Sequence, residues 1–134
     1  MIRKIDHIAV AVKDLDQEIK KYRDVLGLEM VGTETVAEQK VRVAIFKVGE
    51  VSIELMEPTA EDSPISSFLE KQGGGIHHVA LAVDHLANQI EILQENGVGM
   101  FDTTPRKGAD GARIAFAHPK DFSGVLIEFT QREE

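Results

Sequence analysis

The stretch IDHIAVAV at residues 5–12 returns 71 residues later as IHHVALAV at residues 76–83. Each copy is an apolar, β-branched segment, the pattern of a strand buried on both faces. Each carries a histidine at the same position, His7 in the first copy and His78 in the second. The duplication therefore predicts two equivalent strands. If a pseudo-two-fold axis relates the copies, their imidazoles face each other.

The repeat continues through the rest of each half. At the same shift Leu15 and Ile19 match Leu86 and Ile90, residues 43–45 match 114–116, and residues 51–55 match 125–129 at a shift of 74. A capping-box pattern at Asp14 and Gln17, followed by apolar residues at helical spacing up to Gly27, predicts the first helix. Further helices are expected at 64–69 and 86–95, and a loop at 104–111. Strands are expected at 5–12, 29–35, 40–47, 50–56, 77–83, 112–117 and 124–131, and a further strand should begin at 100–101.

These elements predict an α+β fold in which two tandem βαβββ modules form one curved eight-stranded sheet around a metal-binding cavity. We expect a single domain over residues 1–134, with module 1 at about 1–58, a linker with a short helix at 59–75, and module 2 at about 76–131. Half-domains of this size are marginal alone, so the modules should pack together.

Composition excludes several classes of function. The chain has no cysteine, so disulfide frameworks and thiolate chemistry are excluded. Its net charge of −8 argues against a nucleic-acid partner. No apolar run suggests a membrane span and no leader precedes the first strand, so a cytoplasmic protein without a membrane partner is expected. Against this acidic background residues 103–120 form a basic segment, with the cations Arg106, Lys107, Arg113 and Lys120.

A glutamate also recurs, in the last strand of each half. Glu54 and Glu128 stand between apolar neighbours, and strand alternation turns each carboxylate to the opposite face from those neighbours. A carboxylate inside a barrel is costly unless it is paired or bound to a metal. Taken singly, a strand histidine is an ordinary core residue and a strand glutamate faces water. The matched positions favour instead a divalent-metal site made of His7, Glu54, His78 and Glu128.

The remaining histidines carry weaker signals. His77 should point to the other face from His78, and His85 should lie at a helix N-terminus. His118 should serve the turn that ends a strand, with a substrate contact as the alternative. None of the three is expected to be a metal ligand.

The chain resembles the vicinal oxygen chelate (glyoxalase/bleomycin resistance) superfamily from residue 5 to residue 131. The segments that carry the resemblance are IDHIAVAV (5–12), IELMEP (53–58), GGGIHHVAL (73–81) and GARIAFAHPKDFSGVLIEFTQ (111–131). Within the superfamily the sequence is most similar to the methylmalonyl-CoA epimerases. The resemblance implies a metal-dependent isomerase, a homodimer, that acts on a small CoA thioester. It also implies one divalent ion, cobalt first and Mn²⁺, Ni²⁺, Fe²⁺ or Zn²⁺ as alternatives, held by the same His and Glu residues.

The implied reaction removes the C2 proton of methylmalonyl-CoA and returns it to the other face, interconverting the (R) and (S) epimers. Glu128 is the first candidate catalytic base and Glu54 the candidate on the other face; both can instead be ligands only. Some members carry a further catalytic glutamate at a position that is Val43 here. Arg106, Lys107, Arg113 and Lys120 are candidates for binding the CoA phosphates, or are solvated surface cations.

Two other functions remain on the same scaffold. A lactoylglutathione lyase uses the same metal frame for proton transfer on a hemithioacetal. A drug-binding resistance protein is non-catalytic, and the intact set of four candidate ligands counts against it. A dioxygenase is disfavoured because it needs two histidines, one carboxylate and open metal positions.

Overall fold

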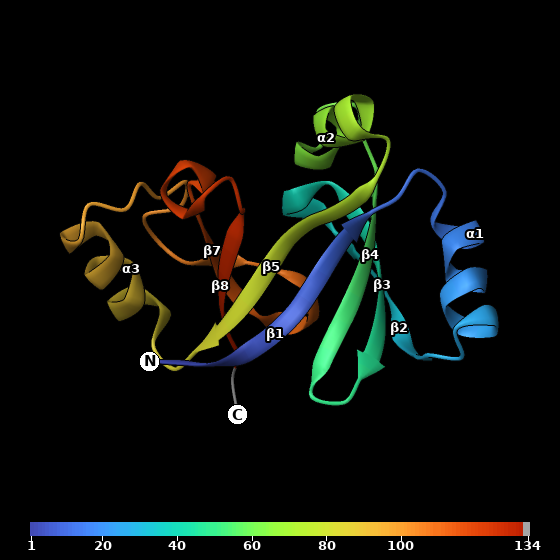
Figure 1. The fold of residues 1–134 in the computed structure, drawn as a ribbon, viewed down its shortest axis with the longest axis horizontal. Coiled ribbons are helices and arrows are strands. Elements are labelled where there is room, and N and C mark those ends of the chain that lie inside the picture. The colour runs from blue at the N-terminus through green and yellow to red at the C-terminus, as the bar shows by residue number, and fades with distance from the viewer. Residues whose placement is uncertain (133–134) are drawn as a thin grey trace. The chain divides into compact units, whose positions relative to one another are not determined.

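The computed structural model describes residues 1–132, which form a mixed α+β fold with the βαβββ order repeated in each half, as the duplication predicts. Figure 1 shows the elements along the chain. The strands are β1 (Ile2–Ala11), β2 (Glu29–Val36), β3 (Val41–Val48), β4 (Val51–Pro58), β5 (Gly75–Val83), β6 (Arg106–Lys107), β7 (Arg113–Ala117) and β8 (Ile127–Gln131), and the helices are α1 (Leu15–Lys20), α2 (Pro64–Gln72) and α3 (Leu86–Glu95). None of these helices is long and apolar enough to cross a membrane.

The chain divides into two compact units. The amino-terminal unit is His7–His77, and the carboxy-terminal unit is Met1–Asp6 together with the chain from His78 onward. Strands β1 and β5 each begin in one unit and continue into the other.

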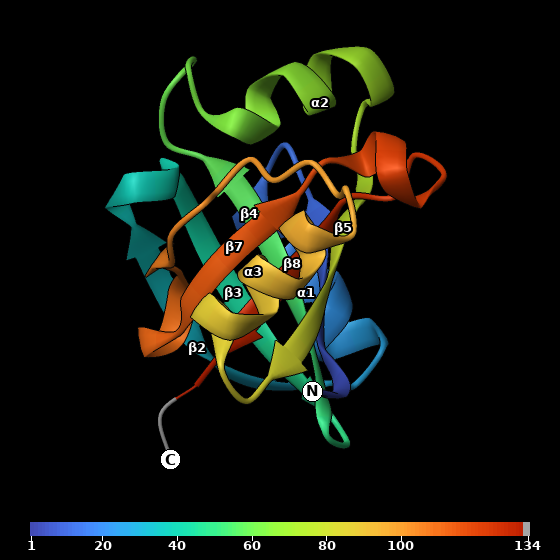
Figure 2. The same ribbon diagram turned by 90° about the vertical axis from the view of Figure 1, so that its left-hand side faces the viewer.

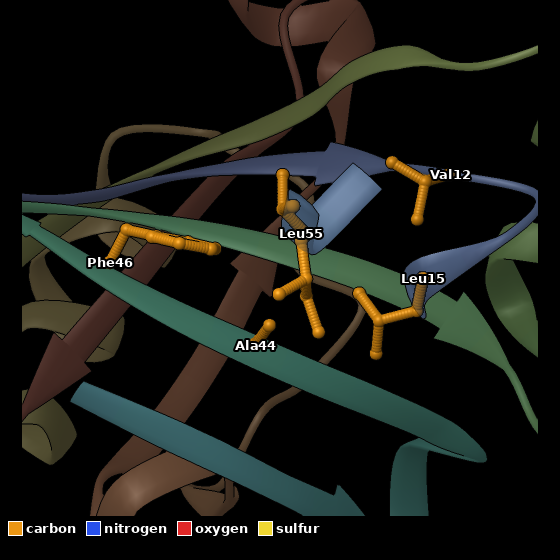
Figure 3. Close-up of a cluster of buried hydrophobic side chains, with 6 residues drawn as sticks. Val12, Leu15, Ala44, Phe46 and Leu55 are labelled. Atoms are coloured by element: carbon orange, nitrogen blue, oxygen red, sulfur yellow. The ribbon is translucent and has the colours of Figure 1, made fainter. Parts of the chain in front are cut away.

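In the amino-terminal unit the strand order is β2-β3-β4-β1, with β1 parallel to β4 and β3 antiparallel to its neighbours. Helix α1 lies beside these strands (Figure 1) and buries its apolar side against them. Figure 3 shows the buried cluster that results, in which strand side chains meet the first residue of the helix. Its members are Val12, Leu15, Ile19, Ala44, Phe46 and Leu55.

Helix α1 begins and ends for identifiable reasons. The Asp14 carboxylate caps it by accepting a 3.2 Å hydrogen bond from the Gln17 N–H, as the capping pattern predicts. After Lys20 the helix widens into a π-type turn, where the Leu26 N–H bonds the Lys21 carbonyl. The wider turn shifts the helical phase, so Leu26 is 61% exposed and does not continue the buried stripe that its spacing suggests.

In the carboxy-terminal unit the order is β5-β8-β7-β6, with β5 parallel to β8 and the other pairs antiparallel. Helix α3 lies across β7 and β8 (Figure 2). Its buried cluster occupies the positions that match the first cluster at the two sequence shifts: Val83, Leu86, Ile90, Ala115, Ala117 and Phe129. The aromatic ring has moved between them, because Phe46 becomes Ala117 while Leu55 becomes Phe129. The two cores are thus filled at the same positions with the bulk redistributed.

The sequence prediction was wrong at one strand. Instead of a strand from Met100, there is an isolated bridge between Met100 and Ala117, and β6 falls inside the expected loop. The Asp102 carboxylate accepts the Phe116 N–H at 2.9 Å, so a side chain takes the place of a backbone carbonyl there. Pro105, which has no N–H, also interrupts the pairing.

Candidate metal-binding residues and active site

The amino-terminal unit brings His7 and Glu54 together. In the parallel pair β1–β4, Ala9 lies opposite Glu54 and His7 opposite Ser52. Residues in register share a face of the sheet, and residues two apart on a strand do so as well. His7 and Glu54 are therefore on the same face, the one opposite α1. His7 Nδ1 lies 3.3 Å from Glu54 Oε2, and both side chains are almost fully buried.

The carboxy-terminal unit repeats this arrangement with His78 and Glu128. Ala80 lies opposite Glu128 in the parallel pair β5–β8, which puts His78 on the Glu128 face. His78 Nε2 lies 3.2 Å from Glu128 Oε1, and both side chains are buried. Phe116, the antiparallel partner of Glu128, meets the His78 ring edge-on at a centroid distance of 5.0 Å. This packing holds the imidazole in one orientation.

Each unit therefore offers one buried imidazole nitrogen and one buried carboxylate. Burying a carboxylate is costly unless it is paired or bound to a metal. Imidazole and carboxylate are also the donor types that divalent transition metals accept. The residues of both units thus fit a divalent ion, and their role as ligands remains a prediction.

The predicted basic residues are not gathered on one face. Arg106 lies opposite Ile114, on the face of its unit that carries Phe116 and Glu128. Its Nε donates to Asp102 Oδ1 at 2.8 Å, and its guanidinium lies 5.7 Å from the centre of the Phe116 ring. Arg106 is therefore the member of the set that the fold holds in place.

The other three cations are on different surfaces. Lys107 and Arg113 lie opposite each other on the other face of β6–β7, and both are exposed. Lys120 is exposed in the 3-10 turn Pro119–Phe122. A binding role for these side chains remains a prediction.

Val43 lies on the same face as Glu54. Its strand neighbour Ile45 is opposite Glu54, and Val43 itself is opposite Met56 and 1% exposed. The position at which the family resemblance implies a further glutamate is thus an apolar part of this face.

Two of the three remaining histidines have local partners, and the third lies at a helix end. The His77 ring packs edge-on against Phe68 of α2 at 5.1 Å. His85 occupies the N-cap position of α3, at the helix N-terminus where it was expected. His118 Nδ1 accepts the Lys120 N–H at 3.2 Å, which confirms its part in the turn.

Sequence reasoning missed a second matched pair. Glu57 Oε2 accepts the Leu15 N–H at the start of α1 at 2.8 Å, and Gln131 Oε1 accepts the Leu86 N–H at the start of α3 at 2.7 Å. The repeat contained the signal, because Glu57 and Gln131 match at the shift of 74 that relates Glu54 to Glu128. Each last strand therefore carries a carboxylate in a buried His–Glu pair and, three residues later, an acceptor for its helix.

The chain is similar to known proteins over nearly its whole length. The model of the Glyoxalase/Bleomycin resistance protein/Dioxygenase superfamily matches residues 6–116. The uncharacterized protein YqjC of Bacillus subtilis is 43% identical, over 97% of this chain and 93% of its own length. The ethylmalonyl-CoA/methylmalonyl-CoA epimerase of Cereibacter sphaeroides is 38% identical, over 98% and 99%. A variant of the Streptomyces coelicolor methylmalonyl-CoA epimerase, solved in complex with 2-nitronate-propionyl-CoA, superposes with a TM-score of 0.94 at 38% identity, over 98% of this chain and 95% of that one.

Proposed function

The chain belongs to the glyoxalase/bleomycin resistance protein/dioxygenase superfamily, and we propose that within it the protein is a methylmalonyl-CoA epimerase. The observation that carries the proposal is the buried imidazole–carboxylate pair found in both units, His7 with Glu54 and His78 with Glu128. Full-length similarity to an epimerase of 38% identity supports the choice of reaction. A homodimer is part of the proposal, on the family resemblance alone.

We further propose that the two pairs together bind one divalent metal ion, with cobalt as the first candidate. The support is the donor chemistry, the burial of both carboxylates and the matched positions of the pairs in the repeat. Such an ion supplies Lewis-acid stabilisation of the negative charge that develops on the substrate oxygens.

The protein's own residues must move the proton. The C2 proton of methylmalonyl-CoA lies between a thioester and a carboxylate, so its removal leaves a planar enolate whose two faces are open to protonation. Glu128 is the proposed base on one face: it is a buried carboxylate, and it would have to detach in part from the metal to accept the proton. Glu54 is its counterpart in the repeat. General acid–base catalysis by a placed carboxylate contributes about 10²- to 10⁴-fold.

Arg106 is the proposed main contact for the phosphates of the CoA portion. It is the half-buried cation of the basic segment and is oriented by Asp102. A guanidinium held in this way binds phosphate oxygens with two parallel hydrogen bonds. Lys107, Arg113 and Lys120 would contribute a weaker, longer-range attraction that salt screens.

Two substrates separate the proposal from its main rival. The metal-loaded protein is given methylmalonyl-CoA in one reaction and the methylglyoxal–glutathione hemithioacetal in another. The proposal predicts turnover of the CoA ester, loss of that turnover in His78→Ala, and wild-type turnover in the exposed control His85→Ala. Turnover of the hemithioacetal alone would establish a glyoxalase instead, and turnover of neither would favour a binding protein.

A further inference from the structure

Strand β2 contains a β-bulge. Met30 lies opposite Phe46 and Gly32 lies opposite Ile45, so Val31 between them has no partner on β3. A bulge of this kind adds one residue to a strand and reverses which face the following side chains occupy. The bulge therefore decides where the second half of β2 directs its side chains.

Its consequence falls on Glu34. Met30 packs against the buried cluster under α1, and strand alternation without a bulge would put Glu34 on that same face. With the bulge, Glu34 lies opposite Val43. Val43 shares a face with Glu54, as described above. The bulge thus moves the Glu34 carboxylate from the α1 face to the face of His7 and Glu54.

Glu34 and Glu54 lie on the same face of the sheet, two strands apart. Their strands are two apart and their positions two residues out of register, which puts their Cα atoms about 12 Å apart from standard strand spacing and rise. Across the sheet, Gly32 of β2 lies opposite Ile45 of β3, which in turn lies opposite Glu54 of β4. A Cβ atom added to Gly32 would meet nothing within 4 Å. There is therefore free space above Gly32, two residues before Glu34 on the same face of β2.

We propose that Glu34, in place of Glu54, is the base for one of the two epimers in the epimerase reaction, so that Glu54 serves the metal site alone. This inference rests on the proposed function. Glu34 would take the place of the glutamate that some relatives carry at the position of Val43, from the neighbouring strand. The half-buried side chain lies on the appropriate face, while Val43 offers no proton acceptor.

The step is a proton transfer without oxidation or reduction. The C2–H bond of one epimer breaks, the proton goes to the Glu34 carboxylate, and the electron pair of the bond moves onto the thioester carbonyl as the enolate forms. In this direction Glu128 starts in its protonated form, and its proton goes to the opposite face of C2 to give the other epimer. Exchange with water then restores both carboxyl groups to their starting protonation states. Each base thus serves one epimer, which makes the two epimers experimentally distinguishable.

The test is deuterium exchange from each epimer separately in D₂O, followed by NMR at C2. We expect Glu34→Gln to lose at least about 100-fold of the exchange from one epimer, the low end of general-base catalysis, and to keep the exchange from the other. Epimerisation should be lost to the same extent. The control is Glu38→Gln, which makes the same charge change at an exposed position just beyond β2 and should behave as wild type.

Urea unfolding and metal content of the Glu34→Gln protein should match wild type, because the residue is on an edge strand and is only half-buried. Wild-type exchange from both epimers in Glu34→Gln would overturn the inference while leaving the proposed function intact. Equal loss from both epimers would also overturn it, because Glu34 would then support binding and not proton transfer. A wild-type protein that exchanges neither epimer would overturn the proposed function itself and this inference with it.

Discussion

The matched acceptors Glu57 and Gln131 each accept a hydrogen bond from the first residue of a helix, and the contribution of these bonds to the free energy of unfolding can be measured. Leu15 and Leu86 are the first residues of α1 and α3, so their N–H groups have no partner inside the helix. Both residues are 0% exposed while their acceptors are in place, so these N–H groups depend on the acceptor side chains. Glu57→Ala should therefore cost about 1–3 kcal/mol for the unpaired N–H. A further loss of about 0.3–1 kcal/mol should follow from the missing charge at the helix N-terminus.

Glu57→Gln provides the matched control. It keeps an oxygen acceptor for the Leu15 N–H, the solution that the second half already uses with Gln131. It loses the favourable charge at the helix N-terminus, worth about 0.3–1 kcal/mol. Both variants at position 57 also lose the ion pair with Arg42, 3.8 Å away at a partly exposed position, which contributes about 0–1 kcal/mol to stability. Gln131→Ala should cost about 1–3 kcal/mol, because it too leaves a buried N–H unpaired.

Urea unfolding of the metal-free proteins, followed by circular dichroism at constant m-value, gives these differences directly. The expected order of stability is wild type, then Glu57→Gln, then Glu57→Ala. Equal stability of the Gln and Ala variants at position 57 would refute the reasoning, because it would mean that the hydrogen bond to Leu15 contributes nothing.

Three further predictions concern backbone strain, pH and metal. Gly74→Ala should destabilise the fold by about 1–3 kcal/mol in urea unfolding, because φ is +131° there and the new Cβ would lie 3.1 Å from the Ala11 carbonyl oxygen; unchanged stability would contradict this. The hydrogen bond from Arg3 lowers the pKa of Asp84, so this pair stabilises the fold above the ordinary carboxyl pKa and loses that effect as pH falls through the lowered value. Arg3→Ala should move the Asp84 NMR titration midpoint upward, and an unmoved midpoint would disprove the pairing. Cobalt at about 1,000 times its dissociation constant should raise the unfolding free energy by about 4 kcal/mol, reversibly with chelator, whereas no change would exclude a bound ion in the folded state.

The repeat in the sequence predicted most of the secondary structure. Strand periodicity located β1, β3, β4 and β5 to within a few residues, and the cap at Asp14 gave the start of α1. Matching His78 and Glu128 to the first half also identified the side chains that the structure brings together in each unit. These features depend on local periodicity and on the duplication, which a single sequence displays.

The features that could not be predicted depend on the register between strands. The bulge at Val31 changes the face of Glu34, and nothing in the apolar pattern of β2 marks the extra residue. At Asp102 a side chain accepts the Phe116 N–H, and the strand predicted from Met100 does not form. Arg106 became distinguishable from the other cations of its segment only once the pairing of β6 with β7 assigned it a face. Tertiary pairing decides each of these, and local sequence does not.

The most direct measurement of the central claim follows one epimer of methylmalonyl-CoA in D₂O with the metal-loaded wild-type protein, with and without a chelator. A metal-assisted epimerase predicts that both epimers accumulate with deuterium at C2, and that the chelator stops both events. Recovery of the starting epimer with its C2 proton intact, from protein shown to be folded and metal-bound, would contradict the account.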